Sequence, residues 1–303
     1  MKFNSILTGL CLLAVGFSSC NLETDNENNF VTNTYSCCNL VIPADDAPFA
    51  TRNSYTIKVY PFAQNATITS TDLSLGYGVG SFTTGTMPIA DNVYTIDGSN
   101  QAVSFFSGGF ANENGLLIEN MNGFISTLIY SLSAGYPNLT GFQFTPRISF
   151  VASYTVNHDF TVKTFMPDAV YVGTTNVTSA GVSSSPQDQK EARYRVVFSE
   201  DMKKASVIIY ELGLNENTPL GYGLLLRDLP VTYTKYGYEI KGINFVAETF
   251  GNYTGESSFE FKNFTFTNNS SDLTECGIFF NIQHGDDIYN GTFQGAYVRS
   301  KID

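Results

Sequence analysis

The stretch Tyr194-Arg195-Val196-Val197-Phe198 places a bulky side chain at every second position facing one way. A period of two is that of a β-strand with one buried face, whereas a helix repeats every 3.6 residues. The pattern recurs at Phe259 and Phe261, and turn residues such as Glu200-Asp201 separate the apolar runs. We therefore predict eight short strands, near 193–199, 204–212, 221–233, 236–242, 243–249, 257–267, 275–284 and 287–299.

An earlier part of the chain repeats this pattern. The segment Tyr55-Thr56-Ile57-Lys58-Val59 lines up with the opening stretch, and Met87-Pro88-Ile89 lines up with Leu229-Pro230-Val231. Further matches follow in the same order, with small drifts at loops. Ordered self-similarity of this kind indicates an internal duplication. Two copies need two cores, so we predict two domains.

The composition favours an all-β protein. Tyr (18) and Phe (25) are abundant, and no long segment has a helical period. Short connections between successive strands favour antiparallel pairing. Eight such strands can close into a barrel, and a two-layer sandwich is the alternative. We predict two tandem similar antiparallel β domains, with eight-stranded barrels favoured over β-sandwiches.

The N-terminus resembles a bacterial lipoprotein signal. Ile6 to Phe17 form an apolar core that is too short to span a bilayer. Phe17-Ser18-Ser19-Cys20 then resembles a lipobox, in which the cysteine thiol accepts a lipid. We predict lipidation of Cys20, and the acidic, amide-rich stretch 21–29 should be a flexible tether.

The expected domains follow from these features. They are the signal peptide at 1–19, the lipidated cysteine with its tether and lead-in at 20–50, a first β domain at 51–175, a linker at 176–190 and a second β domain at 191–303. The linker is placed where small polar residues show no periodicity.

Taken together, the lipobox, the paired copies and the strand pattern resemble lipoproteins of Bacteroidetes with duplicated calycin-like or related β domains. The acidic tether also resembles that of surface-exported lipoproteins in this group. The resemblance implies barrels and a lipid anchor at the outer membrane, facing the cell surface. A periplasm-facing position is the alternative. No catalytic residue is transferred.

The charge excludes some partners. The formal net charge is -12, which repels the phosphates of nucleic acids and anionic lipid headgroups. Membrane attachment should therefore depend on the lipid on Cys20.

Catalytic and metal-binding patterns are nearly absent. His158 and His284 sit beside predicted hairpin turns and are interpreted as solvated turn residues. Gly76-Tyr77-Gly78 has a twin in Gly221-Tyr222-Gly223, which indicates a shared strand bend rather than a phosphate loop. We predict no enzymatic activity, no catalytic residue, no metal site and no cofactor, although calcium at an acidic turn stays open.

Three cysteines follow the lipobox. Cys37 and Cys38 are adjacent, and Cys276 falls in phase with Ile278 and Phe280. An exported protein can form disulfides, so a bridge from Cys37 or Cys38 to Cys276 is one alternative. The other is that Cys276 is a small buried core residue.

The function predicted is binding. The first hypothesis is a lipid-anchored binding or accessory protein for a glycan or other small molecule, with Tyr77, Tyr222, Tyr236 and Tyr238 as candidate ligand contacts. The alternative is a structural or adhesive surface module without a small-molecule ligand. The sequence does not identify the ligand or any protein partner.

Overall fold

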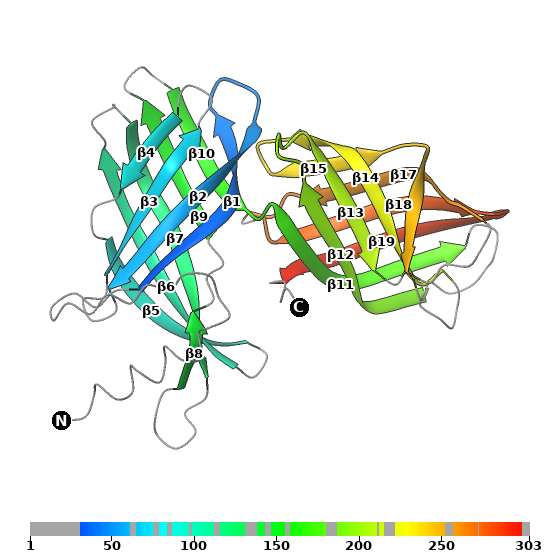
Figure 1. Ribbon diagram of the computed structural model, residues 1–303, viewed down its shortest axis with the longest axis horizontal. Helices are drawn as coiled ribbons and strands as arrows, with labels where there is room; N and C mark the ends of the chain where they lie inside the picture. Colours follow the sequence, from blue (N-terminus) through cyan, green and yellow to red (C-terminus); the bar gives the residue numbers. More distant parts are fainter. Residues whose placement is uncertain are drawn as a thin grey trace. The chain divides into compact units, whose positions relative to one another are not determined.

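The computed structural model describes residues 31–60, 65–74, 79–83, 87–96, 99–111, 116–130, 138–142, 147–154, 158–179, 187–210, 212–214, 222–251, 257–271 and 273–298. Within these ranges every regular element is a β-strand, which confirms the all-β prediction. The strands form two sheets, which correspond to two compact units except that residues 46–52 group with the second unit (Figure 1). Among the described residues no helix is long and apolar enough to cross a membrane.

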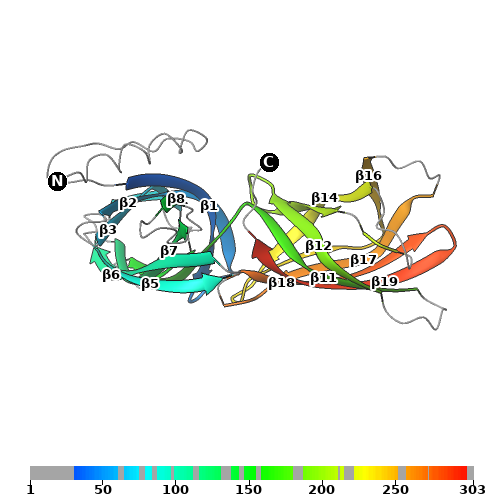
Figure 2. The same cartoon turned by 90° about the horizontal axis from the view of Figure 1, so that it is seen from below.

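The first unit is a closed antiparallel barrel. Its strands are β1 (Val31–Pro43), β2 (Phe49–Tyr60), β3 (Asn65–Ser74), β4 (Val79–Thr83), β5 (Met87–Ile96), β6 (Ser99–Ala111), β7 (Leu116–Tyr130), β8 (Asn138–Phe142), β9 (Arg147–Tyr154) and β10 (His158–Phe165). The order β2-β1-β10-β9-β7-β6-β5-β3 closes because β3 also pairs with β2, which makes eight strands in the ring. β4 and β8 pair only with β3 and β7. Figure 2 shows this ring nearly end-on.

The second unit repeats this architecture. Its strands are β11 (Asp168–Ser179), β12 (Gln187–Phe198), β13 (Lys204–Tyr210), β14 (Tyr222–Tyr233), β15 (Tyr238–Gly242), β16 (Phe245–Gly251), β17 (Phe259–Asn268), β18 (Glu275–His284) and β19 (Asp287–Val298). The order β13-β12-β11-β19-β18-β17-β15-β14 closes through pairing of β13 with β14. β16 follows β15 in the same place of the ring, between β14 and β17.

The strand register supports the duplication. In the first barrel Tyr55 pairs with Ser70, and in the second Tyr194 pairs with Ile209. The same shift of 139 residues relates the two pairs, and it holds along the whole hairpin. The hairpin β2–β3 is therefore repeated without a slip as β12–β13.

The units divide the chain at places that differ from the expected domain boundaries. β1, expected in the lead-in, pairs with β10 and closes the first barrel. β11 starts the second barrel, before the boundary expected at residue 175, and the linker expected at 176–190 is strand at both of its ends. Small polar residues form strand there because Thr175 and Val177 turn inward and pair with Phe293 and Gly291 of β19.

The interior of the second barrel is packed with aromatic side chains. The largest fully buried ones are Tyr171, Tyr194, Tyr238, Phe259, Phe261, Phe264, Phe266, Phe280 and Phe293. The alternation predicted for Tyr194, Val196 and Phe198 is confirmed, since all three are buried. In β17 a register shift between Phe261 and Asn263 restarts the alternation, so that Phe264 and Phe266 also face inward.

Candidate functional site

The wall of the second barrel opens at one seam, between β14 and the pair β15–β16. Ile240 pairs with Val231, but Glu248 pairs with Leu225, so β15–β16 contains two residues more than the part of β14 that it faces. Against β17 the register of β15–β16 runs unbroken, from Gly242–Phe264 to Phe245–Phe261. The mismatch is therefore confined to the β14 side, where the strands separate.

Two residues in the left-handed backbone region bend the strands at this level. Asp228 in β14 has φ 53° and Asn244, between β15 and β16, has φ 52°. Asp and Asn tolerate this conformation better than other residues with a Cβ. On its other side β14 bulges against β13, where the register shifts between Ala205 and Val207. Local backbone geometry on both sides of the seam, in β14 and between β15 and β16, therefore keeps the strands apart.

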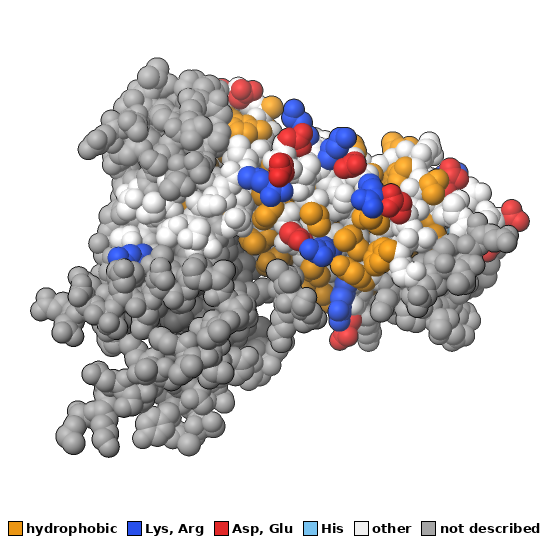
Figure 3. All heavy atoms as spheres, viewed as in Figure 1, with side chains coloured by type: hydrophobic (Ala, Val, Ile, Leu, Met, Phe, Trp, Pro, Cys, Tyr) orange, Lys and Arg blue, Asp and Glu red, His pale blue; other side chains and the backbone are white. Residues whose placement is uncertain are grey.

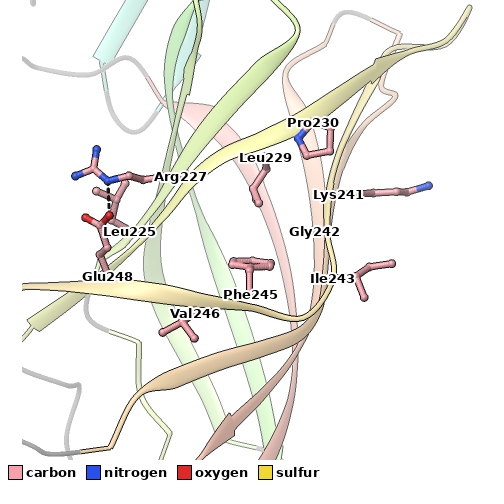
Figure 4. Close-up of a pocket in the computed structure, with 10 residues that line it drawn as sticks. All are labelled: Leu225, Arg227, Leu229, Pro230, Lys241, Gly242, Ile243, Phe245, Val246 and Glu248. Atoms are coloured by element: carbon pink, nitrogen blue, oxygen red, sulfur yellow. Dashed lines mark hydrogen bonds and ion pairs between the residues drawn. The ribbon is translucent and has the colours of Figure 1, made fainter.

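The open seam forms a depression of about 430 Å³ on the outside of the barrel, which we call the seam pocket. Its lining residues are Leu225, Arg227, Leu229, Pro230, Lys241, Gly242, Ile243, Phe245, Val246 and Glu248. Figure 4 shows Leu229 and Phe245 projecting into the opening between the strands. Phe245 in turn stacks on the buried Phe261, with ring centroids 5.3 Å apart. Core side chains therefore form the floor of the pocket.

Apolar side chains are exposed at the edge of the seam pocket. Ile243 is 70% exposed and Val246 is 60% exposed, the largest values among the bulky aliphatic residues described. Figure 3 shows apolar side chains surfacing between charged ones on this unit. Exposed apolar groups beside a hollow are typical of binding surfaces rather than of ordinary barrel walls.

The charges around the seam pocket are paired within the chain. Arg227 Nε lies 2.7 Å from Glu248 Oε1 across the opening, and Lys241 Nζ lies 2.6 Å from Glu239 Oε2. Hydrogen bonding to Glu248 raises the pKa of Arg227, and the same bond lowers the pKa of Glu248. Although the whole chain is acidic, the edge of the pocket is electrically neutral.

A second, smaller hollow lies at the turn between β14 and β15. It has a volume of about 320 Å³ and is lined by Thr234, Lys235, Tyr236, Tyr238, Glu239, Thr267 and Asn269. Tyr236 is 61% exposed, and Lys235 Nζ lies 5.0 Å from the centre of its ring. The turn is held by a hydrogen bond from the Thr234 backbone N–H to the Gly237 carbonyl. An exposed aromatic ring among hydroxyl, amide and carboxylate groups suits the stacking of a sugar.

The four tyrosines proposed as ligand contacts lie in different settings. Tyr236 is at the smaller hollow, whereas Tyr238 is only 1% exposed and its hydroxyl lies 2.9 Å from that of Tyr171. Burial raises the pKa of Tyr238 far above its ordinary value, so it stays protonated within the core. Tyr222 begins β14, but its side chain and the whole of Tyr77 fall outside the described residues.

His284 and the three cysteines lie in structural settings. The His284 ring stacks on Phe259 at 4.1 Å and its Nδ1 lies 3.2 Å from the Ser258 carbonyl oxygen. His158 begins β10, and its side chain is not described. Cys37, Cys38 and Cys276 are buried and not joined in disulfides, and the alternation of β18 confirms Cys276 as a core residue. Among the described residues no group of His, Cys, Asp or Glu could hold a metal ion.

Of the two Gly-Tyr-Gly stretches singled out in the sequence, the one in the second barrel is partly described. Gly223 lies in β14 opposite Phe250, whose ring packs so closely that a Cβ would come within 2.0 Å of it. Tyr222 and Gly223 therefore lie in a regularly paired strand, without the bend that was predicted, and Gly221 lies outside the described residues. The twin at residues 76–78 lies outside the described residues.

The comparisons with known proteins do not define the fold, which is assigned from the strand pairing in the structure. No protein-family model and no curated protein matches this chain. Transferrin binding protein B from serogroup B Neisseria meningitidis is 11% identical over 82% of this chain and 66% of its own, just under two thirds, with a TM-score of 0.29. Intact Ap-TbpB is 10% identical over 89% of this chain and 77% of its own, with a TM-score of 0.26. A double mutant of transferrin binding protein B from Haemophilus parasuis Hp5 is 9% identical over 89% of this chain and 76% of its own, also with a TM-score of 0.26. The molecule is therefore defined by its own geometry, as two eight-stranded antiparallel barrels with an open apolar seam in the second.

Sequence reasoning did not find the seam pocket. Its residues lie on β14, β15 and β16, and they meet only because the register differs on the two sides of β15–β16. The available signal was the pair of adjacent predicted strands at 236–242 and 243–249, which left no room for a turn between them. Such a junction is typical of one interrupted strand rather than a hairpin.

Proposed function

We propose that this chain is a lipid-anchored binding protein of the cell surface that holds a protein partner in the seam pocket of its second barrel. The observation that carries this proposal is the apolar opening on the outside of a barrel whose described interior is packed with aromatic residues. An interior occupied by its own side chains favours contact through the outer wall over a small molecule held inside.

The chemistry of the seam pocket supports a protein partner. Its centre is apolar, with Leu229 and Phe245 as the floor, and its edge carries the ion pair of Arg227 with Glu248. Ile243 and Val246 extend the apolar surface to the edge, beside this ion pair. An apolar patch bordered by charged groups is the usual anatomy of a protein interface, where one or two large side chains carry most of the affinity. The partner would insert an uncharged aliphatic or aromatic side chain, because each cation described at the edge already has a carboxylate.

Site-specific photo-crosslinking on intact cells tests this proposal. A photoreactive amino acid at Val246 should give a covalent adduct with one protein, and Ile243→Asp should abolish that adduct by placing a charge at the apolar edge. The matched control position is Ile288, which is also exposed (40%) but is the second residue of β19, away from the seam. Equal adducts at both positions, or none at Val246, would contradict the proposal.

The anchor is tested separately. Replacing Cys20 with Ala should move the protein from the membrane fraction to the soluble fraction, because the lipid has no other attachment point in this proposal. Cys276→Ala serves as the control and should leave the protein in the membrane fraction. Retention of the Cys20 variant would refute the anchor, and protection from protease added to intact cells would favour the periplasm-facing alternative.

A glycan-binding role is the second candidate, favoured by the hollow at Tyr236. The exposed ring offers a face for stacking, while Thr234 and Asn269 offer hydrogen-bonding groups. A glycan screen of the mature protein should then find binding that Tyr236→Ala removes and Ile243→Asp leaves intact. Failure of all glycans in such a screen would leave the protein partner as the function.

A further inference from the structure

The first barrel contains a buried polar cluster on β1, β2 and β3. Asn39 and Ser70 are 0% exposed, and Asn53 is 5% exposed. The Tyr55 hydroxyl donates to Asn39 Oδ1 at 2.9 Å, and the Ser70 hydroxyl donates to Asn53 Oδ1 at 3.0 Å. Burial raises the pKa of the Tyr55 hydroxyl, and Tyr55 pairs with Ser70 across β2 and β3. The four side chains therefore converge within the interior.

Two donors of this cluster are left without an acceptor. Asn39 Nδ2 and Asn53 Nδ2 are buried and have no hydrogen-bond partner in the described part of the chain. Burying an amide without its hydrogen bond costs about 1–3 kcal/mol in proteins. Two such groups in one cluster indicate a position that an acceptor from outside the chain would fill.

The second barrel serves as an internal reference. At the shift of 139 residues that relates the two hairpins, Asn53 corresponds to Ala192 and Ser70 to Ile209, both apolar and buried. Tyr55 corresponds to Tyr194, whose hydroxyl is 3.1 Å from Thr175 Oγ1. Two of these positions are thus apolar in the second barrel, whereas in the first barrel they carry a carboxamide and a hydroxyl.

We infer that the interior of the first barrel binds a neutral molecule through a carbonyl or hydroxyl oxygen, which accepts hydrogen bonds from Asn39 Nδ2 and Asn53 Nδ2. N–H donors repel a cation, and no described side chain of this cluster is charged, so an anion would be buried without a counter-charge. Val41 is in phase with Asn39 on β1, and Ile68 is in phase with Ser70 on β3. Val162 of β10 pairs with Val41, and all three side chains are buried. The body of the bound molecule is therefore apolar.

Thermal denaturation of the mature protein tests this site with three probes that share a ten-carbon chain. The neutral 1-decanol should raise the melting temperature by a few degrees. Decane, which has no acceptor oxygen, and decanoate, which is charged, should raise it less or not at all. The double variant Asn53→Ala/Ser70→Ile installs the residues of the second barrel and should abolish the difference between 1-decanol and decane.

The outcomes separate this inference from the proposed partner in the seam pocket. If 1-decanol gives no shift beyond that of decane, or gives the same shift in the double variant, the inference is overturned and the two amides bind ordered water. Selective ¹⁵N labelling of asparagine provides a second readout, since the side-chain amide signals of Asn39 and Asn53 should move with 1-decanol. The seam variant Ile243→Asp should respond to 1-decanol as the unaltered protein does, because it lies in the other unit.

Discussion

At the scale of single residues, glycine determines where the barrel wall can close. A Cβ on Gly173 would lie 1.9 Å from the Gln294 carbonyl oxygen and 2.5 Å from the Gly295 Cα, both of which are backbone atoms. A Cβ on Gly242 would instead lie 2.4 Å from Phe245 Cε1 and 2.8 Å from Leu229 Cδ2. Backbone of a paired strand cannot yield, whereas the ends of side chains at an open pocket can turn away.

We therefore expect different costs for alanine at these two positions. Gly173→Ala should destabilise the second barrel by about 3 kcal/mol, the upper end of the usual range for overpacking. Gly242→Ala should cost below about 1 kcal/mol, while pushing Phe245 into the seam pocket. Urea denaturation of the two variants measures both values, and similar costs would contradict this assignment of the seam as open.

The buried tyrosines of the second barrel should make it sensitive to alkali. Burial raises the pKa of Tyr171, Tyr194 and Tyr238 well above the ordinary value of 10. The unfolded chain therefore loses these protons first as the pH rises above about 10, and stability falls with pH by about 1.4 kcal/mol per unit for each tyrosine. Unfolding free energies between pH 10 and pH 12 should show this slope, and a flat profile would contradict burial. Tyr194→Phe should reduce the slope by the contribution of one tyrosine.

At the scale of elements, the seam shows how a closed sheet acquires an opening. β15 and β16 occupy one place in the ring, and β17 pairs with both in a single register. On this side of β14 the pairing stops between Leu225 and Val231, where the facing chain bends at Asn244, while β14 stays paired with β13. The two extra residues of β15–β16 are enough to expose the apolar floor of the seam pocket without opening the rest of the barrel.

The ion pair across this opening should contribute little to stability. The side chains of Arg227 and Glu248 are 58% and 56% exposed, and water screens most of the attraction between charges at such a surface. We expect Arg227→Met to destabilise the second barrel only slightly, with the difference disappearing in 1 M NaCl. Chemical denaturation at low and high salt checks it. A larger, salt-independent loss would mean that the Arg227 stem, rather than its charge, supports the wall.

At the scale of the whole molecule, each barrel is closed by a strand that lies outside the expected domain. β11 pairs with both β12 and β19, so a second barrel without it would expose two strand edges. Exposed edges of this length are prone to aggregation.

Two fragments test this dependence. A fragment of residues 166–303 contains β11 and should unfold cooperatively as a monomer. A fragment of residues 190–303 lacks β11 and the beginning of β12, so it should aggregate or remain unfolded. Circular dichroism melts and size-exclusion chromatography distinguish the two. Cooperative folding of the shorter fragment would show that β11 is dispensable for the barrel.

The sequence by itself determined the local properties of this protein. The period of two in Tyr194–Phe198 predicted the strand and its buried face, and self-similarity predicted a hairpin register that the structure repeats. Alternation and repetition are visible in sequence because they depend on neighbouring positions along the chain. Lipidation of Cys20 belongs to the same kind of evidence and stays a prediction.

Only the tertiary structure decided which strands close each barrel, and where the wall opens. The pairing of β11 with β19 joins residues more than a hundred positions apart, and the seam arises from a register mismatch between β14 and β15–β16. The unpaired amides of Asn39 and Asn53 likewise depend on what three strands bring together in one interior. These features are properties of non-local pairing, which no window of sequence contains, and they are the features that carry the proposed binding sites.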